Sequence, residues 1–188
     1  MSQAVLKDDF YEKIKPRLHQ RIGRELRLAG RVLDLGCGAC DLVQYLARTY
    51  HQEVIGVDIS GGSFPNRRHT SDGQRFRCLH KNAMDLAFVR DASVDAVVLM
   101  WALHEMEHPK AILAEAHRVL RPGGELLIVD FPRGSLAQRL WNENYYSPEK
   151  VEQLVNRSGF SEVRATVIER RQILWIRGHR PALQGPQQ

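Results

Sequence analysis

The 188-residue sequence predicts one α/β domain whose mostly parallel sheet is doubly wound, with cover on both faces. Short apolar runs with the length of buried strands alternate with helical or loop crossovers, which favours parallel pairing. Two further strand-like runs near the C-terminal end follow each other with no crossover between them, which predicts an antiparallel hairpin at the sheet edge. No internal repeat is present, and the length leaves no room for a second domain.

The first predicted element is an amphipathic helix over residues 7–28. Apolar residues recur there at four-residue steps and form one stripe of the helix: Phe10, Ile14, Leu18, Ile22 and Leu26. Pro16 lies within this pattern as a kink or a restart, and Gly30 ends it.

The elements that follow alternate along the chain. Predicted strands cover 32–35, 54–60, 75–79, 94–101, 125–131, 163–168 and 172–176, and predicted helices cover 41–49, 109–120 and the segment from Ser147 to Gly159. Residues 61–73 are rich in Gly, Pro, Ser and Asn, so helix and mobile loop both stay open there. Residues 132–146 are predicted as a loop, and 178–188 as a disordered tail.

The composition is that of an ordinary globular protein, with 43% hydrophobic and 26% charged residues. No apolar run is long enough to span a membrane, and the first residues lack an apolar signal core, so we expect a cytoplasmic protein. The net charge of +5 raises the odds of an anionic partner such as nucleic acid. The basic residues are dispersed and not interleaved with aromatic ones, which favours a solvated basic face.

The three cysteines are an odd count in segments that resemble buried or turn structure, which argues against a disulfide framework. Cys37 and Cys40 form a Cys-x-x-Cys pair, a pattern found in metal and redox sites. A second pair with similar spacing is missing, and Cys78 stands alone in a strand-like run. We therefore favour small residues in a glycine turn and predict no metal site.

The strongest local pattern is a strand, a tight turn and a helix start within about a dozen residues. Val32–Leu35 is apolar apart from Asp34, two glycines follow at Gly36 and Gly38, and helical spacing resumes at Asp41. Glycine lets a ligand approach the backbone, and the unpaired N–H groups of a helix start face that ligand. Alone, this pattern is compatible with a dinucleotide, a phosphate or no ligand.

Three segments in order resemble class I S-adenosylmethionine-dependent methyltransferases of the type 11 group. Asp34-Leu35-Gly36-Cys37-Gly38 is similar to the family's first motif, Asp58 to its ribose-binding acid, and 118–126 to its helix-to-fifth-strand signature. The resemblance covers roughly 30–131 and implies a Rossmann-like seven-stranded sheet with an antiparallel last strand. It implies S-adenosyl-L-methionine as cofactor, S-adenosyl-L-homocysteine as product, a lid helix over 1–30 and a core over 31–177.

The same resemblance assigns the cofactor contacts. They are Asp34, Gly36, Cys37, Gly38, Asp58, Ile59, Asn82, Ala83, Met84 and Trp101. Asn82 departs from the acidic residue common at its position, although its amide carbonyl can accept from the adenine amino group. Cys40 stands where the first motif often has a further glycine.

The acceptor side is less defined. The resemblance places the loop after the fourth strand beside the transferred methyl group, which makes His104 and Glu105 candidates for proton removal or substrate contact; a purely structural His104 is the alternative. Tyr11, Trp141, Tyr145 and Tyr146 come from segments that build the substrate lid in this family. Residues 104–108 also match His-Glu-x-x-His, but Pro109 and the preceding strand argue against a zinc-protease helix.

We therefore predict methyl transfer from S-adenosylmethionine to a small-molecule acceptor by a monomer or dimer. Methylation of RNA or of a protein partner is the alternative that the charge supports. A non-catalytic cofactor-binding scaffold is a third possibility because Asn82 and residues 61–73 deviate from the family. The acceptor atom, and whether a base is used, stay open because a sulfonium is already an activated methyl donor.

Overall fold

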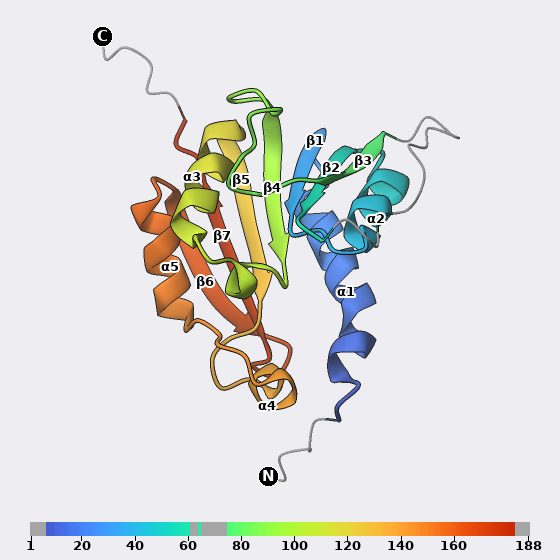
Figure 1. The fold of residues 1–188 in the computed structure, drawn as a ribbon, viewed down its shortest axis with the longest axis vertical. Coiled ribbons are helices and arrows are strands. Elements are labelled where there is room, and N and C mark those ends of the chain that lie inside the picture. Colours follow the sequence, from blue (N-terminus) through green and yellow to red (C-terminus); the bar gives the residue numbers. More distant parts are fainter. Residues whose placement is uncertain (1–6, 61–63, 65–74, 183–188) are drawn as a thin grey trace.

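A computed structural model describes residues 7–60, 64 and 75–182, and its centre is a seven-stranded sheet (Figure 1). The strands are β1 (Arg31–Leu35), β2 (Glu53–Asp58), β3 (Phe76–His80), β4 (Val94–Met100), β5 (Leu120–Asp130), β6 (Ser161–Ile168) and β7 (Ile173–His179). Their order is β3-β2-β1-β4-β5-β7-β6. Strand β7 is antiparallel to both β5 and β6, whereas the pairs from β3 to β5 are parallel. The predicted fold class is confirmed.

Helices cover the sheet on both faces, as the buried clusters of side chains show. One face packs against α1 (Phe10–Glu25), α2 (Asp41–Tyr50) and α4 (Leu136–Trp141). The other packs against α3 (Pro109–Val119) and α5 (Pro148–Arg157).

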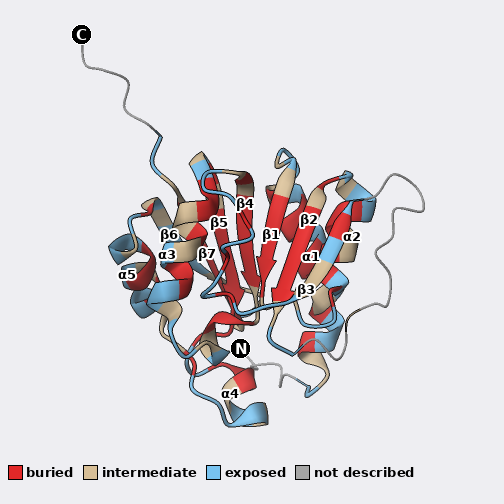
Figure 2. Cartoon of the chain, turned by 45° about the horizontal axis from the view of Figure 1, so that its top comes forward, coloured by how far each residue is buried: buried red, intermediate tan, exposed pale blue. Residues whose placement is uncertain are grey.

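The central strands are buried on both sides, which explains their continuous apolar sequence (Figure 2). In β5, Leu126 and Ile128 pack with the α3 and α5 side, while Leu127 and Val129 pack with the α1 and α2 side. All four are fully buried. Alternation of this kind needs apolar residues at every position, so the strand lacks the polar face of a half-exposed sheet.

Two segments differ from the sequence-based prediction, and a third cannot be compared. Strand β7 continues to His179, so the tail predicted from 178 starts too early; Arg180 still exchanges backbone hydrogen bonds with Gly123 and Gly124. The short helix α4 lies in the predicted loop 132–146. Residues 61–73, for which helix and mobile loop were both left open, lie outside the described residues apart from Phe64, as does the end of the tail. Among the described helices, none is long and apolar enough to cross a membrane.

Helix α1, predicted as a lid, is also a core element. Its apolar stripe is buried from Ile14 to Ile22, and Pro16 sits inside the helix without ending it. The hydroxyl of Tyr11 donates to Gln172 Oε1 (3.2 Å) and accepts from the Ala137 N–H (2.9 Å), which ties α1 to the start of α4 and to the turn between β6 and β7. One flank of α1 remains free to border the cavity described next.

Candidate active site

A cavity of about 570 Å³ opens where β1, β2 and β4 end, at the point where the strand order reverses. Ligands of open α/β sheets bind at such a switch point, and the volume suits a ligand of nucleoside size or larger. All ten residues predicted to contact the cofactor line it: Asp34, Gly36, Cys37, Gly38, Asp58, Ile59, Asn82, Ala83, Met84 and Trp101.

The glycine turn after β1 is fastened to β2 by its backbone. The N–H groups of Gly36 and Cys37 both donate to the carbonyl of Val57, at 2.8 and 3.1 Å. Gly36 has a φ of +77°, and a Cβ there would lie 2.4 Å from the Cβ of Ala102, so glycine is required on both counts. At Gly38 a Cβ would meet nothing within 4 Å, which leaves space for a ligand against the backbone.

Asp58, at the end of β2, is oriented toward this turn. Its Oδ2 accepts from the Gly38 N–H at 2.8 Å, and its Oδ1 accepts from the backbone and hydroxyl of Ser60. Partial burial opposes ionisation, but these hydrogen bonds outweigh it and lower the pKa of Asp58. The carboxylate is therefore ionised and fixed, with lone pairs left for the paired hydroxyls of a ribose.

Asp34 is a buried carboxylate with an orphaned oxygen at the base of the cavity. It is 1% exposed, and its Oδ1 has no hydrogen-bond partner among the described residues. Burial, together with the charge of Asp58, raises the pKa of Asp34 to about 7. A ligand that brings positive charge would relieve this cost, and S-adenosylmethionine carries both a sulfonium and an ammonium group. The residues present therefore fit that cofactor.

Asn82 is oriented differently from the sequence-based expectation. Its Oδ1 accepts from the Met84 N–H at 2.9 Å in a turn after β3, so the carbonyl predicted to meet the adenine amino group is already engaged. Its amide nitrogen has no protein partner among the described hydrogen bonds. This Asn therefore has a donor to offer, which suits a ring nitrogen better than an amino group.

Sequence reasoning missed the contribution of α1 to the cavity. Lys15 and His19 line it from positions i and i+4, and Lys15 forms a 2.6 Å ion pair with Asp41 at the start of α2. Burial, followed by the charge of Lys15, lowers the pKa of His19 to about 4, so its ring stays neutral. The four-residue spacing beside the apolar stripe was the only signal in the sequence.

His104 forms a buried pair with Asp130, a partner that sequence reasoning also missed. Nδ1 of His104 donates to Oδ1 of Asp130 at 2.7 Å, and both side chains are 4% exposed. Backbone N–H groups of His104 and Phe131 donate to the same carboxylate at 3.1 and 2.8 Å. Asp130 ends β5 and His104 lies in a 3-10 turn after β4, so the pair joins two adjacent strand ends.

The other nitrogen of His104 faces two further carboxylates. Its Nε2 lies 3.2 Å from Oε2 of Glu143 and 3.8 Å from Oε1 of Glu105. Of these three residues only Glu105 lines the cavity, so His104 itself does not border it. Burial works to lower the pKa of His104, but the hydrogen bond and charge of Asp130 with the two glutamates raise it overall. His108 directly precedes α3 whereas His104 lies in the 3-10 turn, so the two histidines do not share one helix as a zinc protease would require.

The four aromatic residues predicted to bind substrate do not line the cavity. Tyr11 and Tyr145 are buried and pack with Phe131, and Trp141 is 46% exposed beside Tyr11. Tyr146 packs on the opposite face of the sheet. Trp101 connects this aromatic cluster to the cavity, because it lines the cavity and stacks on Phe131 with centroids 5.2 Å apart.

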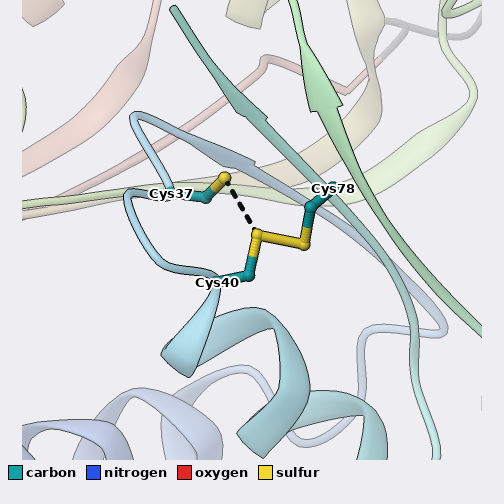
Figure 3. A group of neighbouring side chains, drawn as sticks. All are labelled: Cys37, Cys40 and Cys78. Atoms are coloured by element: carbon teal, nitrogen blue, oxygen red, sulfur yellow. Dashed lines mark hydrogen bonds between the residues drawn. A yellow bond between two sulfur atoms is a disulfide. The ribbon is translucent and has the colours of Figure 1, made fainter. Parts of the chain in front are cut away.

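The expectation that the cysteines form no disulfide is wrong for one pair. Cys40 and Cys78 are bonded, and Cys37 is the free cysteine (Figure 3). The reason is the fold: β3 pairs with β2 so that Cys78 lies beside Gly56, next to the start of α2. The 38-residue separation gave no sign of this proximity.

Fold and cavity together define a Rossmann-like α/β protein with a nucleoside-sized site at its switch point. Residues 33–128 match the methyltransferase domain family, and the chain belongs to that family. The match contains both glycines of the turn, Asp58 and the segment around His104.

Two curated relatives and one solved structure illustrate the similarity. The chain is 36% identical over 126 residues to phthiotriol/phenolphthiotriol dimycocerosates methyltransferase 1 of Mycobacterium ulcerans, covering 64% of this chain and 45% of the relative. It is 39% identical over 103 residues to the fatty-acid O-methyltransferase of Mycolicibacterium smegmatis, and this match covers 53% of this chain and 36% of the relative. The chain thus spans less than half the length of these relatives. The solved structure of a SAM-dependent methyltransferase from Aquifex aeolicus has the same fold as this chain, with a TM-score of 0.71 and 19% sequence identity. The match covers 94% of this chain and 100% of the other.

Proposed function

We propose that the protein transfers a methyl group from S-adenosylmethionine to a small-molecule acceptor. The observation that carries this proposal is the convergence of an ionised Asp58, an open backbone at Gly38 and an unpartnered Asp34 on one cavity. Asp58 would hold the ribose, the turn would accommodate the methionine portion, and Asp34 would balance the positive charge. The relatives described above are named for phthiotriol and phenolphthiotriol dimycocerosates and for fatty acids, which favours a small-molecule acceptor over RNA or protein.

The cofactor supplies the activated methyl group, and the protein aligns the acceptor with it and excludes water. We propose that the acceptor atom is a hydroxyl oxygen, which needs a base, and that His104 removes its proton at Nε2. Asp130 would hold the ring in the tautomer that leaves Nε2 free to accept. The hydroxyl would replace the carboxylate of Glu143 beside Nε2, while Glu105 would contact the acceptor from the cavity.

Calorimetric titration with S-adenosylmethionine tests the cofactor step. Asp58→Ala removes a carboxylate that would accept two ribose hydroxyls, so we expect roughly 100-fold weaker binding or more. Asp85→Ala is the matched control, because Asp85 is exposed and does not line the cavity. Equal affinity of wild type and Asp58→Ala, or no binding by either, would overturn the proposal.

Release of S-adenosylhomocysteine from a panel of apolar alcohols, phenols, amines and thiols tests the transfer step. We expect turnover of hydroxyl compounds; transfer to thiols or amines alone would disprove the role of a hydroxyl acceptor. We also propose a cytoplasmic location and a monomeric or dimeric state, which cell fractionation and light scattering would measure.

A further inference from the structure

Three elements bring all the cysteines of the chain to one point beside the cavity. Cys37 lies in the glycine turn, Cys40 is the N-cap residue of α2, and Cys78 lies in β3 (Figure 3). Their sulfur atoms all lie within 4.8 Å of one another, and the Cys37 and Cys40 sulfurs are 3.5 Å apart. We propose that, in the reduced protein, these three thiolates bind one thiophilic d¹⁰ cation such as Zn²⁺.

The spacing of the sulfurs suits such an ion. With Zn–S bonds of about 2.3 Å, tetrahedral geometry places thiolate sulfurs about 3.8 Å apart. The distance between Cys37 and Cys40 is already close to this value. Only Cys40 and Cys78 must separate, which breaking their disulfide allows.

The surroundings make room for the cluster. Gly56 lies opposite Cys78 in the pairing of β2 with β3, and a Cβ on it would come within 2.8 Å of the Cys37 sulfur. Cys40 is fully buried, whereas Cys37 and Cys78 are partly exposed and Cys37 lines the cavity, so an ion can reach the sulfurs from that side.

The backbone of Cys40 has a conformation that is unusual for a residue with a side chain. Its φ of +65° is left-handed, a conformation that costs a non-glycine residue about 1–2 kcal/mol. A glycine would fit this backbone without that cost. The sulfur of Cys40 is the group that a glycine would lack, and it lies at the centre of the cluster.

The site would exist only in the reduced state. A dithiol passes two electrons and two protons to the Cys40–Cys78 bond and leaves as its own disulfide, so that three thiols result. Binding of Zn²⁺ then releases the three thiol protons and forms three Zn–S bonds, with water as the fourth ligand. The disulfide form offers one thiol and would not bind the ion.

The test is titration of the full chain with Zn²⁺ against a chromophoric chelator, before and after reduction by a phosphine. We expect one equivalent bound after reduction, none before it, and a sulfur-to-metal absorption band when Cd²⁺ replaces Zn²⁺. Cys37→Ser, Cys40→Ser and Cys78→Ser should each weaken Zn²⁺ binding at least about 100-fold. Circular dichroism would show that each variant is folded.

The control is Glu143→Gln, which alters the other group of neighbouring ligand atoms, His104, Glu105 and Glu143, and should bind Zn²⁺ as wild type does. Equal binding before and after reduction, or by the serine variants, would overturn the proposal. So would loss of the ion in Glu143→Gln. The wild-type comparison needs no variant, so an unfolded variant leaves the test intact.

Discussion

The two ends of the candidate site are built in different ways. At the Gly36–Gly38 end, backbone N–H groups within three consecutive residues bond to Val57 and Asp58, and the cavity lies against main chain. At the His104 end, side chains from separate segments make the arrangement: His104 and Asp130 are 26 residues apart, and Tyr11 and Ala137 are 126 residues apart.

This difference separates recognition of the donor from chemistry on the acceptor. A backbone turn tolerates change in most side chains and suits a ligand that every member of a family shares. A site made of side chains can change its shape through single substitutions, which suits an acceptor that differs between members. On this basis the two ends should be energetically independent, so a change at one end should leave the function of the other intact.

The largest effect should come from His104→Gln. If His104 is the base, its loss should lower turnover about 100- to 10,000-fold, while affinity for S-adenosylmethionine stays unchanged because the donor end is intact. Steady-state kinetics and calorimetry measure the two quantities. Unchanged turnover would assign His104 a structural role.

Asp130→Asn sharpens the same test through pH. His104 accepts a proton only when neutral, so the wild-type rate should rise with pH through its raised pKa. Removing the Asp130 charge lowers that pKa, so the rise of the rate with pH should move to lower pH. The maximal rate should also fall, because Asp130 no longer fixes the tautomer of His104. A rise that does not move would show that another group titrates.

Asp34→Asn should change stability at the donor end. The folded-state pKa of about 7 lies above the unfolded value, so the folded protein binds more protons and wild-type stability should fall as pH rises from about 4 to 7. Above pH 7 the variant should therefore be more stable by about 2–4 kcal/mol, and at pH 4 the difference should vanish. Urea unfolding of the unliganded protein at both pH values measures this.

The same variant should bind S-adenosylmethionine more weakly at pH 8, since the buried negative charge is lost. If the variant gains stability and loses affinity, Asp34 is a carboxylate that destabilises the unliganded protein and serves to bind the ligand. If Asp34→Asn is less stable than wild type at every pH, then ionised Asp34 does not destabilise the folded protein.

The sequence was informative where a structural feature is local. The turn, Asp58 and the alternation of strands depend on neighbours in the chain, and they carry the family resemblance that assigned the cofactor contacts. All ten of these residues lie on the cavity. Partners that meet only after the sheet assembles carry no local signal. Asp130 follows an apolar strand like any strand-end acid, and Cys78 becomes a neighbour of Cys40 only because β3 pairs with β2.

The aromatic residues show a second limit. Tyr11, Trp141 and Tyr145 were assigned to the substrate because of the segments they occupy, and in the fold all three lie around Phe131. Their rings nevertheless pack against Phe131 and leave the cavity wall to Trp101. Segment position specifies the neighbourhood of a side chain, whereas burial decides its contacts.

Tyr11→Phe should give the smallest effect and the clearest test of independence. The change keeps the ring and removes a hydroxyl that accepts from the buried Ala137 N–H and donates to Gln172. An unsatisfied buried N–H costs about 1–3 kcal/mol, so we expect the free energy of unfolding to fall by about that much in urea titration. Tyr146→Phe is the matched control, because the Tyr146 hydroxyl makes no hydrogen bond among the residues described.

Affinity for S-adenosylmethionine should be the same in Tyr11→Phe and Tyr146→Phe, because neither tyrosine lines the cavity. Helix α1 nevertheless carries both Tyr11 and the cavity residues Lys15 and His19, so a loosened helix start has a direct route to the donor end. If Tyr11→Phe binds the cofactor more weakly while Tyr146→Phe does not, α1 transmits the change and the two ends are one cooperative unit. Equal affinities would mean that the two ends are energetically independent.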